Sequence, residues 1–499
     1  MARVLLASTY FAALDPKQVA RRRPYPPLGT LYAAAALRAN GHEVALFDAM
    51  LAPDERGFSD QLTATRPDIV VFYEDSFNFL SKMCLSRMRH AVLRMMAVAR
   101  ETEVPILVAG SDMTDHPERY LRAGARAVLV GEADDSLVET VDVLESGDGS
   151  ALAAVDGLVF PDPDAPGGVY RTPPRQPSRY PDRFPLPARD LVDLERYRHI
   201  WREAHGYFSL NMVSTRGCPF HCNWCAKPIW GQRYAMRSAA SVAAELALLK
   251  RTIEPDHVWF ADDIFGLRPD WVTEFAACVR AEGARVPFTM QSRADLMTPA
   301  AVRALGAAGC YEVWLGVESG SQKVLDAMEK GIRVEDVVQA TARLKDAAIR
   351  VAFFVQFGYP GETLDDVLRT VNLVRSLDPD DLGISVSYPL PGTAFHRRVQ
   401  SQLGLKTHWT DSGDLAMMFR GTYDTAFYRR LHALLHREVD LRHHLRAGNI
   451  MADAEPLAEL QRDWDELLLH EPLHRNDAPT TLVPPEHTLP APDLTRSWN

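Results

Sequence analysis

The chain has 499 residues, of which 46% are apolar and 24% are charged, so it holds enough material for about three globular domains. The formal net charge is −11, which leaves no basic excess to neutralise phosphates, so we do not expect a nucleic-acid partner. Six cysteines are too few for a disulfide framework, and no apolar run reaches the length of about 18 residues that a membrane span needs, so we expect a cytoplasmic protein.

Residues 1–150 are predicted to form a flavodoxin-like, doubly wound α/β domain. Short apolar runs alternate here with segments of helical period, which indicates parallel strands joined by helices. Ligands bind beyond the carboxyl ends of the strands in such sheets, so the loops that begin at Thr9, Glu74, Gly110 and Gly131 are candidate binding loops. The predicted strands are Arg3–Ser8, Glu43–Phe47, Asp68–Tyr73, Pro105–Ala109 and Ala127–Val130.

The first predicted strand is not followed by a G-x-G-x-x-G motif, so the sequence does not support a dinucleotide site. Arg21, Arg22 and Arg23 form one compact basic run. Most such runs are solvated, and we expect these three side chains to lie in solvent.

Residues 151–205 are predicted to form a linker with little regular structure. Nine prolines fall between Pro161 and Pro187, which excludes a long helix or a central strand there. Gly157–Phe160 and Val169–Arg171 flank an Ala-Pro-Gly-Gly turn, so we expect them to form a small hairpin.

Residues 206–400 contain a second series of alternating strands and helices. Six such units with short loops predict a partial (β/α)6 barrel, in which chemistry takes place at the carboxyl ends of the strands. The predicted strands are Ser209–Val213, His257–Phe260, Pro287–Gln291, Glu312–Gly316, Val351–Gln356 and Ile384–Tyr388.

Three cysteines follow the first of these strands at C-x3-C-x2-C spacing: Cys218, Cys222 and Cys225. One tight loop can aim three thiolates at a single inorganic centre. A cubane iron-sulfur cluster normally takes four cysteines, so three ligands would leave one iron open to a small molecule. A zinc site that includes His221, or three ordinary buried cysteines, are the alternatives. The remaining cysteines, Cys84, Cys278 and Cys310, are expected to be buried thiols.

Polar residues stand where the later barrel strands end, and each has more than one possible role. Asp262 could accept hydrogen bonds from an ammonium group or cap a helix. Gln291 and Arg293 could contact a ribose or a carboxylate, and Arg293 could equally be a salt-bridged wall residue. A buried glutamate is rare unless it is paired, which favours Glu318 as a ligand-binding residue, with Ser319 beside it.

Residues 401–475 are predicted to form a small, mainly helical cap, with helices at about residues 425–445 and 456–469. The first helix carries His432, His436, His443 and His444, and exposed helical histidines are a better interpretation of these than a metal site. Residues 476–499 are rich in proline and polar residues, so we expect a disordered tail.

The cysteine motif, with Trp224 before its third cysteine, resembles the signature of the radical S-adenosylmethionine (SAM) enzymes. The stretches Gly316-Val-Glu-Ser-Gly-Ser321 and Pro389-Leu-Pro-Gly-Thr393 resemble further motifs of that family. The resemblance implies that Cys218, Cys222 and Cys225 hold a [4Fe-4S] cluster whose fourth iron is chelated by SAM. It also implies that SAM is contacted by the polar strand-end residues: Asp262, Gln291, Arg293, Glu318 and Ser319.

The first domain resembles the cobalamin-binding domain that precedes many radical SAM barrels. The resemblance rests on residues 26–37, on the Gly110-Ser111 turn and on Val130-Gly131-Glu132. The D-x-H-x-x-G motif is absent, so cobalt is expected to have no histidine beneath it, and the corrin would be held through residues near Thr9, Ser76, Ser111 and Gly131. The alternative is a flavodoxin-like domain that binds nothing.

Together these resemblances imply a cobalamin-dependent radical SAM enzyme, most simply a C-methyltransferase that acts on an unactivated carbon of a small molecule. Flavodoxin or ferredoxin would be the reducing partner. One alternative is an anaerobic oxidative cyclase like the magnesium-protoporphyrin IX monomethyl ester cyclase, which uses the same two domains. The non-enzymatic alternative is a corrinoid carrier or sensor.

Overall fold

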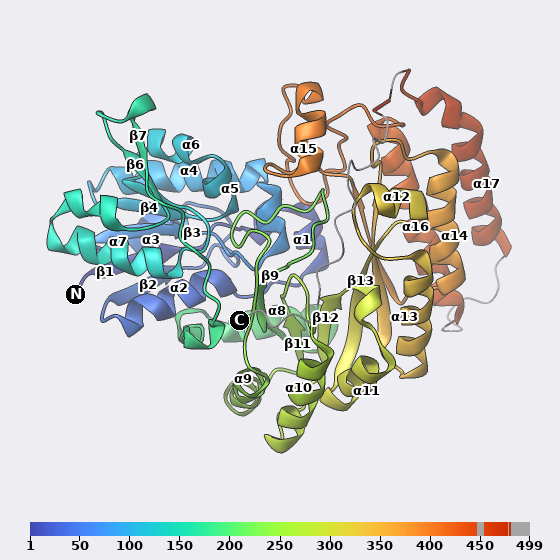
Figure 1. Cartoon of the computed structure of the whole chain (residues 1–499), viewed down its shortest axis with the longest axis horizontal. Helices are drawn as coiled ribbons and strands as arrows, with labels where there is room; N and C mark the ends of the chain where they lie inside the picture. Colours follow the sequence, from blue (N-terminus) through green and yellow to red (C-terminus); the bar gives the residue numbers. More distant parts are fainter. Residues whose placement is uncertain (447–453, 478, 481–499) are drawn as a thin grey trace.

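The computed structural model of the chain describes residues 1–446, 454–477 and 479–480, and it contains two α/β units that lie side by side (Figure 1). The first unit holds one sheet and the second holds another. Helices α16 (Thr425–Arg446) and α17 (Ala454–His470) pack against each other on the outer side of the second unit. The two predicted C-terminal helices are thus confirmed.

The first sheet has the strand order β2-β1-β3-β4-β5-β6-β7, and its first five strands are parallel. These strands are runs of valine, leucine, isoleucine and alanine, as expected where helices cover both faces of a parallel sheet. The prediction of a doubly wound domain is confirmed. The strands are β1 (Arg3–Ala7), β2 (Glu43–Phe47), β3 (Ile69–Tyr73), β4 (Ile106–Ala109) and β5 (Ala127–Leu129); the helices are α1 (Pro16–Arg21), α2 (Leu28–Ala39), α3 (Gly57–Thr65), α4 (Ser86–Arg100), α5 (Ser111–Asp115), α6 (Pro117–Arg122) and α7 (Asp134–Ser146).

The first sheet continues beyond residue 150, into the segment for which a linker was predicted. β6 (Leu158–Pro161) pairs antiparallel with β5, and β7 (Val169–Arg171) pairs antiparallel with β6. The predicted hairpin is therefore present, but it extends the sheet because β5 would otherwise leave an unpaired edge. The same segment ends in a regular helix, α8 (Leu194–His205).

The second sheet has six parallel strands in the order β15-β14-β13-β12-β11-β8, which confirms the predicted partial barrel. A helix lies between most successive strands. The strands are β8 (Ser209–Met212), β11 (His257–Phe260), β12 (Phe288–Ser292), β13 (Cys310–Glu318), β14 (Arg350–Phe357) and β15 (Asp381–Val386); the helices are α9 (Ala239–Thr252), α10 (Pro269–Ala281), α11 (Pro299–Ala308), α12 (Gln322–Ala327), α13 (Val334–Asp346), α14 (Leu364–Leu377) and α15 (Ala394–Val399).

A small antiparallel hairpin, β9 (Thr215–Gly217) with β10 (Tyr234–Met236), closes the loop that carries the three cysteines. Gly217 has a φ of +79°, and a Cβ there would collide with the carbonyl oxygen of Arg233. Only glycine therefore lets the two ends of the loop approach each other here.

The predicted tail from residue 476 lies mostly outside the described residues. Its described part packs on the chain, since the backbone N–H of Asn476 donates to the Thr422 carbonyl and that of Thr480 donates to the Arg420 carbonyl. Across the part of the chain that the structure describes, no helix has both the length and the apolar character needed to cross a bilayer.

Candidate active site

A cavity of about 990 Å³ lies between the two sheets and is lined by residues of both units. Its size is at the upper end of the range for ligand sites, which is about 300 to 1,000 Å³. Alternate side chains of β13 form part of its barrel wall, namely Glu312, Trp314, Gly316 and Glu318. The first unit contributes Tyr10, most of residues 17–25, residues 50–53 and most of residues 75–83.

The three cysteines all line this cavity, and Asn223 between them fixes their loop. The Asn223 backbone N–H donates to the Met328 carbonyl at 3.1 Å, and its side-chain amide donates to the Ala327 carbonyl at 2.8 Å. Burial raises the pKa of the Cys218 thiol and raises that of Cys225 to about 12, while Lys82 and Lys227 oppose the shift at Cys225. A positively charged centre at this loop would remove that penalty, because metal ions deprotonate the thiols that bind them.

The spacing of the cysteines fits an iron-sulfur cluster better than zinc. A tetrahedral zinc ion with Zn–S bonds of about 2.3 Å brings its sulfur ligands within roughly 4 Å of one another. At least one pair of the three Sγ atoms is more than 4.8 Å apart, because the cysteines do not form a group within that distance. A cubane of four irons is larger than one zinc ion, so its thiolates stand farther apart.

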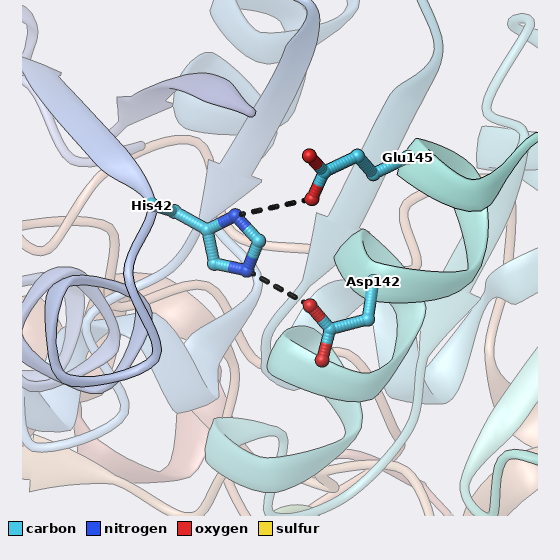
Figure 2. A group of neighbouring side chains, drawn as sticks. All are labelled: His42, Asp142 and Glu145. Carbon is cyan, nitrogen blue, oxygen red and sulfur yellow. Dashed lines mark hydrogen bonds and ion pairs between the residues drawn. The ribbon is translucent and has the colours of Figure 1, made fainter. Parts of the chain in front are cut away.

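Among the described residues, one group of three potential metal ligands does lie within 4.8 Å: His42, Asp142 and Glu145 (Figure 2). The buried imidazole of His42 lies 3.1 Å from the Asp142 carboxylate and 4.0 Å from that of Glu145. Glu145 is also paired with the amino terminus. His42 directly precedes β2, at the opposite end of the sheet from the cavity, so these contacts tie β2 to α7 and do not belong to the active site.

Of the two adjacent aspartates after β11, only Asp263 lines the cavity. Asp262 is fully buried, and its carboxylate accepts hydrogen bonds from the backbone N–H groups of Ser214 and Thr215 at 2.8 and 2.7 Å. Burial raises its pKa to about 6. Asp262 therefore anchors the start of the cysteine loop, and the carboxylate that a ligand can reach is that of Asp263. The sequence could not distinguish the two aspartates, because it does not show in which direction each side chain points.

Gln291 and Arg293 both line the cavity, and most of the Arg293 N–H donors are bonded to the protein wall. Its guanidinium donates to the carbonyls of Lys330 and Gly331 and to Asp295, and it stacks on the Phe220 ring at 3.7 Å. The wall interpretation of Arg293 thus fits its contacts. Gln291 donates to the Asp262 backbone carbonyl and lines the cavity.

Glu318 lies at the carboxyl end of β13, and its carboxylate accepts a hydrogen bond from the Lys330 ammonium at 2.8 Å. Both side chains are buried and both line the cavity. A Cβ at Gly316 would lie 2.7 Å from Lys330 Nζ, so glycine makes room for this ion pair. Ser319 is fully buried, contacts Thr370 at 3.1 Å and does not line the cavity, which indicates a structural role.

None of the four residues predicted near the corrin lines the large cavity: Thr9, Ser76, Ser111 and Gly131. The carboxyl end of β4 is closed, because the buried carboxylate of Glu74 accepts hydrogen bonds from the backbone N–H groups of Ser111 and Asp112. Burial raises the pKa of Glu74 to about 8. The cavity opens over the carboxyl ends of β1, β2 and β3 only. The rule that ligands bind beyond the carboxyl ends of parallel strands therefore predicted more binding loops than line the cavity.

A small cleft of about 10 Å³ lies beside Thr9 and Glu74, and it has room for about one water molecule. The hydroxyls of Ser81, which lines it, and of Ser111 are buried without a hydrogen-bond partner. Unpaired buried hydroxyls are costly, so these two point to a ligand that supplies the missing partners. The role predicted for Ser111 at a corrin stays a prediction, since Ser111 lines neither the large cavity nor this cleft, and the cleft has no room for anything larger than water.

Two family models match the chain. That of the radical SAM superfamily matches residues 212–374, and that of the B12 binding domain matches residues 20–141. The chain combines a B12-binding domain with a radical SAM domain. The two domains stand in the order that the sequence motifs predicted, and the prediction of an enzyme is confirmed.

Two curated relatives span most of the chain. An uncharacterized methyltransferase of Pyrococcus horikoshii is 26% identical over 391 residues, which cover 77% of this chain and 81% of the relative. The anaerobic magnesium-protoporphyrin IX monomethyl ester cyclase of Rubrivivax gelatinosus is 24% identical over 381 residues, which cover 74% of this chain and 65% of the cyclase.

Two solved structures share the fold. The radical SAM methyltransferase TsrM from Kitasatospora setae, solved with cobalamin and a [4Fe-4S] cluster, has a TM-score of 0.66 at 19% identity, covering 81% of this chain and 79% of TsrM. The cobalamin-dependent radical SAM enzyme OxsB, solved with aqua-cobalamin and SAM, has a TM-score of 0.63 at 17% identity, covering 76% of this chain and 52% of OxsB. The predicted fold class is confirmed.

Three ion pairs join the B12-binding domain to the radical SAM domain beside the cavity, and sequence reasoning missed all of them. Arg216 reaches across to Glu132 at 2.6 Å and to Asp134 at 2.9 Å, and all three side chains are buried. Lys82 of the B12-binding domain pairs with Asp263. The Arg-Gly-Cys and Gly-Glu stretches were visible in the sequence, but nothing in it showed that they meet.

Two predictions about exposed side chains are wrong in part. His432 and His436 are half-buried, their rings lie 4.5 Å apart, and burial lowers the pKa of each to about 4. The basic run of residues 21–23 is exposed, but all three arginines line the cavity. Tertiary packing decides the positions of these histidines and arginines, and the local sequence pattern does not indicate them.

Proposed function

We propose that the chain is a cobalamin-dependent radical SAM methyltransferase that methylates an unactivated carbon of a small molecule. The observation that carries this proposal is the single cavity shared by the three cysteines and the B12-binding domain. A methyl donor bound on one wall and a radical source bound on the other could both reach a substrate between them. Proximity of this kind is the main contribution a protein makes to cofactor chemistry.

The chain's own residues have distinct roles in this proposal. Cys218, Cys222 and Cys225 would hold the cluster, while the Glu318–Lys330 pair and Asp263 face the place beside it where SAM would bind. When bound, the cluster and SAM supply a 5′-deoxyadenosyl radical, and methylcobalamin supplies the methyl group. Arg293 on Phe220 closes the wall beside the cysteine loop and excludes water from it.

The corrin would lie against the wall that the B12-binding domain presents, formed by residues 50–53 and 75–83. Thr9, which lines the small cleft, would serve any part of the ligand that enters it, and the roles of Ser76, Ser111 and Gly131 at the corrin stay predictions. None of the described residues that line the cavity from this domain is a histidine. We therefore expect bound cobalamin without a histidine ligand to cobalt.

The test is product analysis with SAM that carries a labelled methyl group, using anaerobically reconstituted protein. We expect 5′-deoxyadenosine together with a product that contains the label. The triple variant in which Cys218, Cys222 and Cys225 are changed to alanine should lose its bound iron and its SAM cleavage. Cys278→Ala is the matched control and should keep both, since Cys278 lies on α10 outside the cavity.

The similarity to the Rubrivivax gelatinosus cyclase supports oxidative ring formation as a second candidate function. A product that forms without the SAM methyl carbon would favour it over methylation. Bound iron and corrinoid without 5′-deoxyadenosine formation would instead favour a carrier or sensor. In either catalytic case we propose that flavodoxin or ferredoxin reduces the cluster, in a reducing compartment such as the cytoplasm.

A further inference from the structure

The end of the cavity away from the cysteines is built by an arm of the B12-binding domain, residues 10–25. A buried carboxylate, Asp15, fixes this arm by accepting hydrogen bonds from the Tyr10 hydroxyl at 2.6 Å and the Ser412 hydroxyl at 2.8 Å. Ser412 belongs to the segment after the barrel, so the arm is fixed by a residue of its own domain and by a residue of the second unit. Its position against the amino ends of β13–β15 is therefore part of the folded structure.

The arm presents three cations that form no ion pair with any residue that the structure describes. No carboxylate of the described residues lies within 4.0 Å of the side-chain nitrogens of Lys17, Arg21 or Arg23, although all three line the cavity. Their neighbour Arg22 differs, because it pairs with Glu203. Partial burial lowers the pKa of Lys17, and the nearby charge of Arg21 lowers it further, so a bound anion would offset the repulsion between these two cations.

The acids at this end of the cavity are largely occupied. Glu312 accepts hydrogen bonds from Arg350 at 3.2 Å and from the Trp314 indole at 3.0 Å. Asp381 accepts a hydrogen bond from the Leu382 backbone N–H. Among the acids, it has the largest electrostatic effect on the pKa of Arg21, which it raises. Asp381 and the buried Asp15 act on these cations, so two carboxylates stand against three cations and this end of the cavity keeps a positive excess in a protein whose net charge is −11.

Beyond the cations, the cavity wall is aromatic. The rings of Trp314 and Phe354 lie with their centroids 4.6 Å apart. A Cβ at Gly383 would come within 3.0 Å of Phe354 and 3.2 Å of Trp314, so the two rings lie directly on the backbone of β15. With the Trp314 indole N–H committed to Glu312, the wall offers a flat apolar surface to a ligand.

We propose that the substrate is an elongated aromatic acid, whose anionic group binds Lys17, Arg21 and Arg23 and whose planar body lies against Trp314 and Phe354. This inference rests on the proposed function, because only an enzyme would turn the bound acid into a product. Binding of the acid at this site does not depend on any reaction. The anionic group is a carboxylate or a phosphate, because either can accept from an arginine pair.

The strand register sets the length of such a molecule. Asp381 beside Arg21 is level with Trp314 on the neighbouring strands, and Glu318 beside the cysteines lies four residues further along β13. At about 3.3 Å per residue, the two levels are separated by roughly 13 Å. The carbon that reacts therefore lies on the order of 10 Å from the anionic group.

Equilibrium dialysis of the reconstituted holoprotein against three probes tests this inference: naphthylbutyrate, its neutral amide naphthylbutyramide, and naphthylpropyl phosphate. We expect at least one of the two anions to bind tenfold or more tightly than the amide, and the tighter anion identifies the natural group. The triple variant Lys17→Gln, Arg21→Gln and Arg23→Gln should lose this tenfold preference without changing the affinity for the amide. Arg38→Gln, the matched control, should keep it, because Arg38 pairs with Asp190 and lies outside the cavity.

Equal affinity of the wild type for the anions and the amide overturns the inference, as does an unchanged preference in the triple variant. If the triple variant loses its iron, the single variant Arg23→Gln is measured instead and should lower the preference at least threefold. Dialysis measures binding and needs no methyl transfer. The methyltransferase proposal and the aromatic-acid proposal can therefore be refuted independently. An absent label in the product would contradict the methyltransferase, whereas an absent preference for anions contradicts only the aromatic acid.

Discussion

Replacing Arg216 by methionine should destabilise the protein far more than the loss of an ordinary ion pair. The guanidinium bridges Glu132 and Asp134, and it lies 3.9 Å from the centroid of the Phe184 ring. The three charged side chains are between 4% and 8% exposed, so water cannot compensate the two carboxylates once the cation is gone. Breaking a buried ion pair by removing one partner costs about 3–5 kcal/mol.

The matched control is Arg268→Ala. Arg268 pairs with Asp270, but the two side chains are 54% and 65% exposed, and exposed pairs contribute about 0–1 kcal/mol. The assay is urea unfolding of the reconstituted protein, followed by both cluster absorbance and tryptophan fluorescence. Because Arg216 stands two residues before Cys218, we expect the cluster signal to be lost at a lower urea concentration in the variant.

The pH dependence gives a second signature. Burial raises the pKa of Glu132, and Arg216 acts against that shift, so the variant should raise this pKa further. A carboxyl whose folded-state pKa is raised contributes stability at low pH that is lost as the pH rises. The destabilisation should therefore be larger at pH 8 than at pH 5.5. A free energy of unfolding within 1 kcal/mol of the Arg268→Ala control at both pH values would refute the reasoning.

Gly316→Ala should cost about 1–3 kcal/mol in thermal or urea unfolding because its Cβ would lie 2.7 Å from Lys330 Nζ, whereas Gly306→Ala, with its nearest neighbour at 4.0 Å, should be neutral or slightly stabilising. Lys330→Met should leave the buried carboxylate of Glu318 unpaired and raise the Kd for SAM at least tenfold by calorimetry; unchanged SAM affinity would remove this pair from the SAM site. Glu362→Gln should change the free energy of unfolding little at pH 5 and increase it by a few kcal/mol at pH 8. Burial raises the pKa of Glu362 to about 8, so the stability that its protonated carboxyl contributes is lost as the pH rises. An equal effect of the substitution at both pH values would contradict that shift.

The architecture followed from the sequence because strand and helix periods are local properties. The valine- and leucine-rich strands of both sheets were placed to within a few residues, and the cysteine loop lies where its motif predicted. The site beyond the cysteines was harder, since a strand-end position does not say which way a side chain points. Asp262 turns to the backbone of Ser214 and Thr215, while Asp263 beside it faces the cavity.

Contacts between the domains were not predictable at all. Glu132 was interpreted as part of a corrin motif, yet its carboxylate pairs with Arg216, 84 residues later in the chain. The basic run at residues 21–23 has no amphipathic pattern that would place it on a cavity wall, and it lies there because Asp15 fixes the arm before it. Long-range packing decided both outcomes, and a single sequence carries no record of it.

The arm of residues 10–25 has a consequence for how such enzymes could diversify. It belongs to the first domain but closes the far end of a cavity whose reactive end belongs to the second, so the segment that selects a guest molecule is separate from the loop that holds the cysteines. A chimaera that carries the arm of a relative could therefore acquire that relative's preference while its own chemistry stays intact. The open six-stranded sheet produced alone would lack this wall, and its radical reactions would meet bulk water.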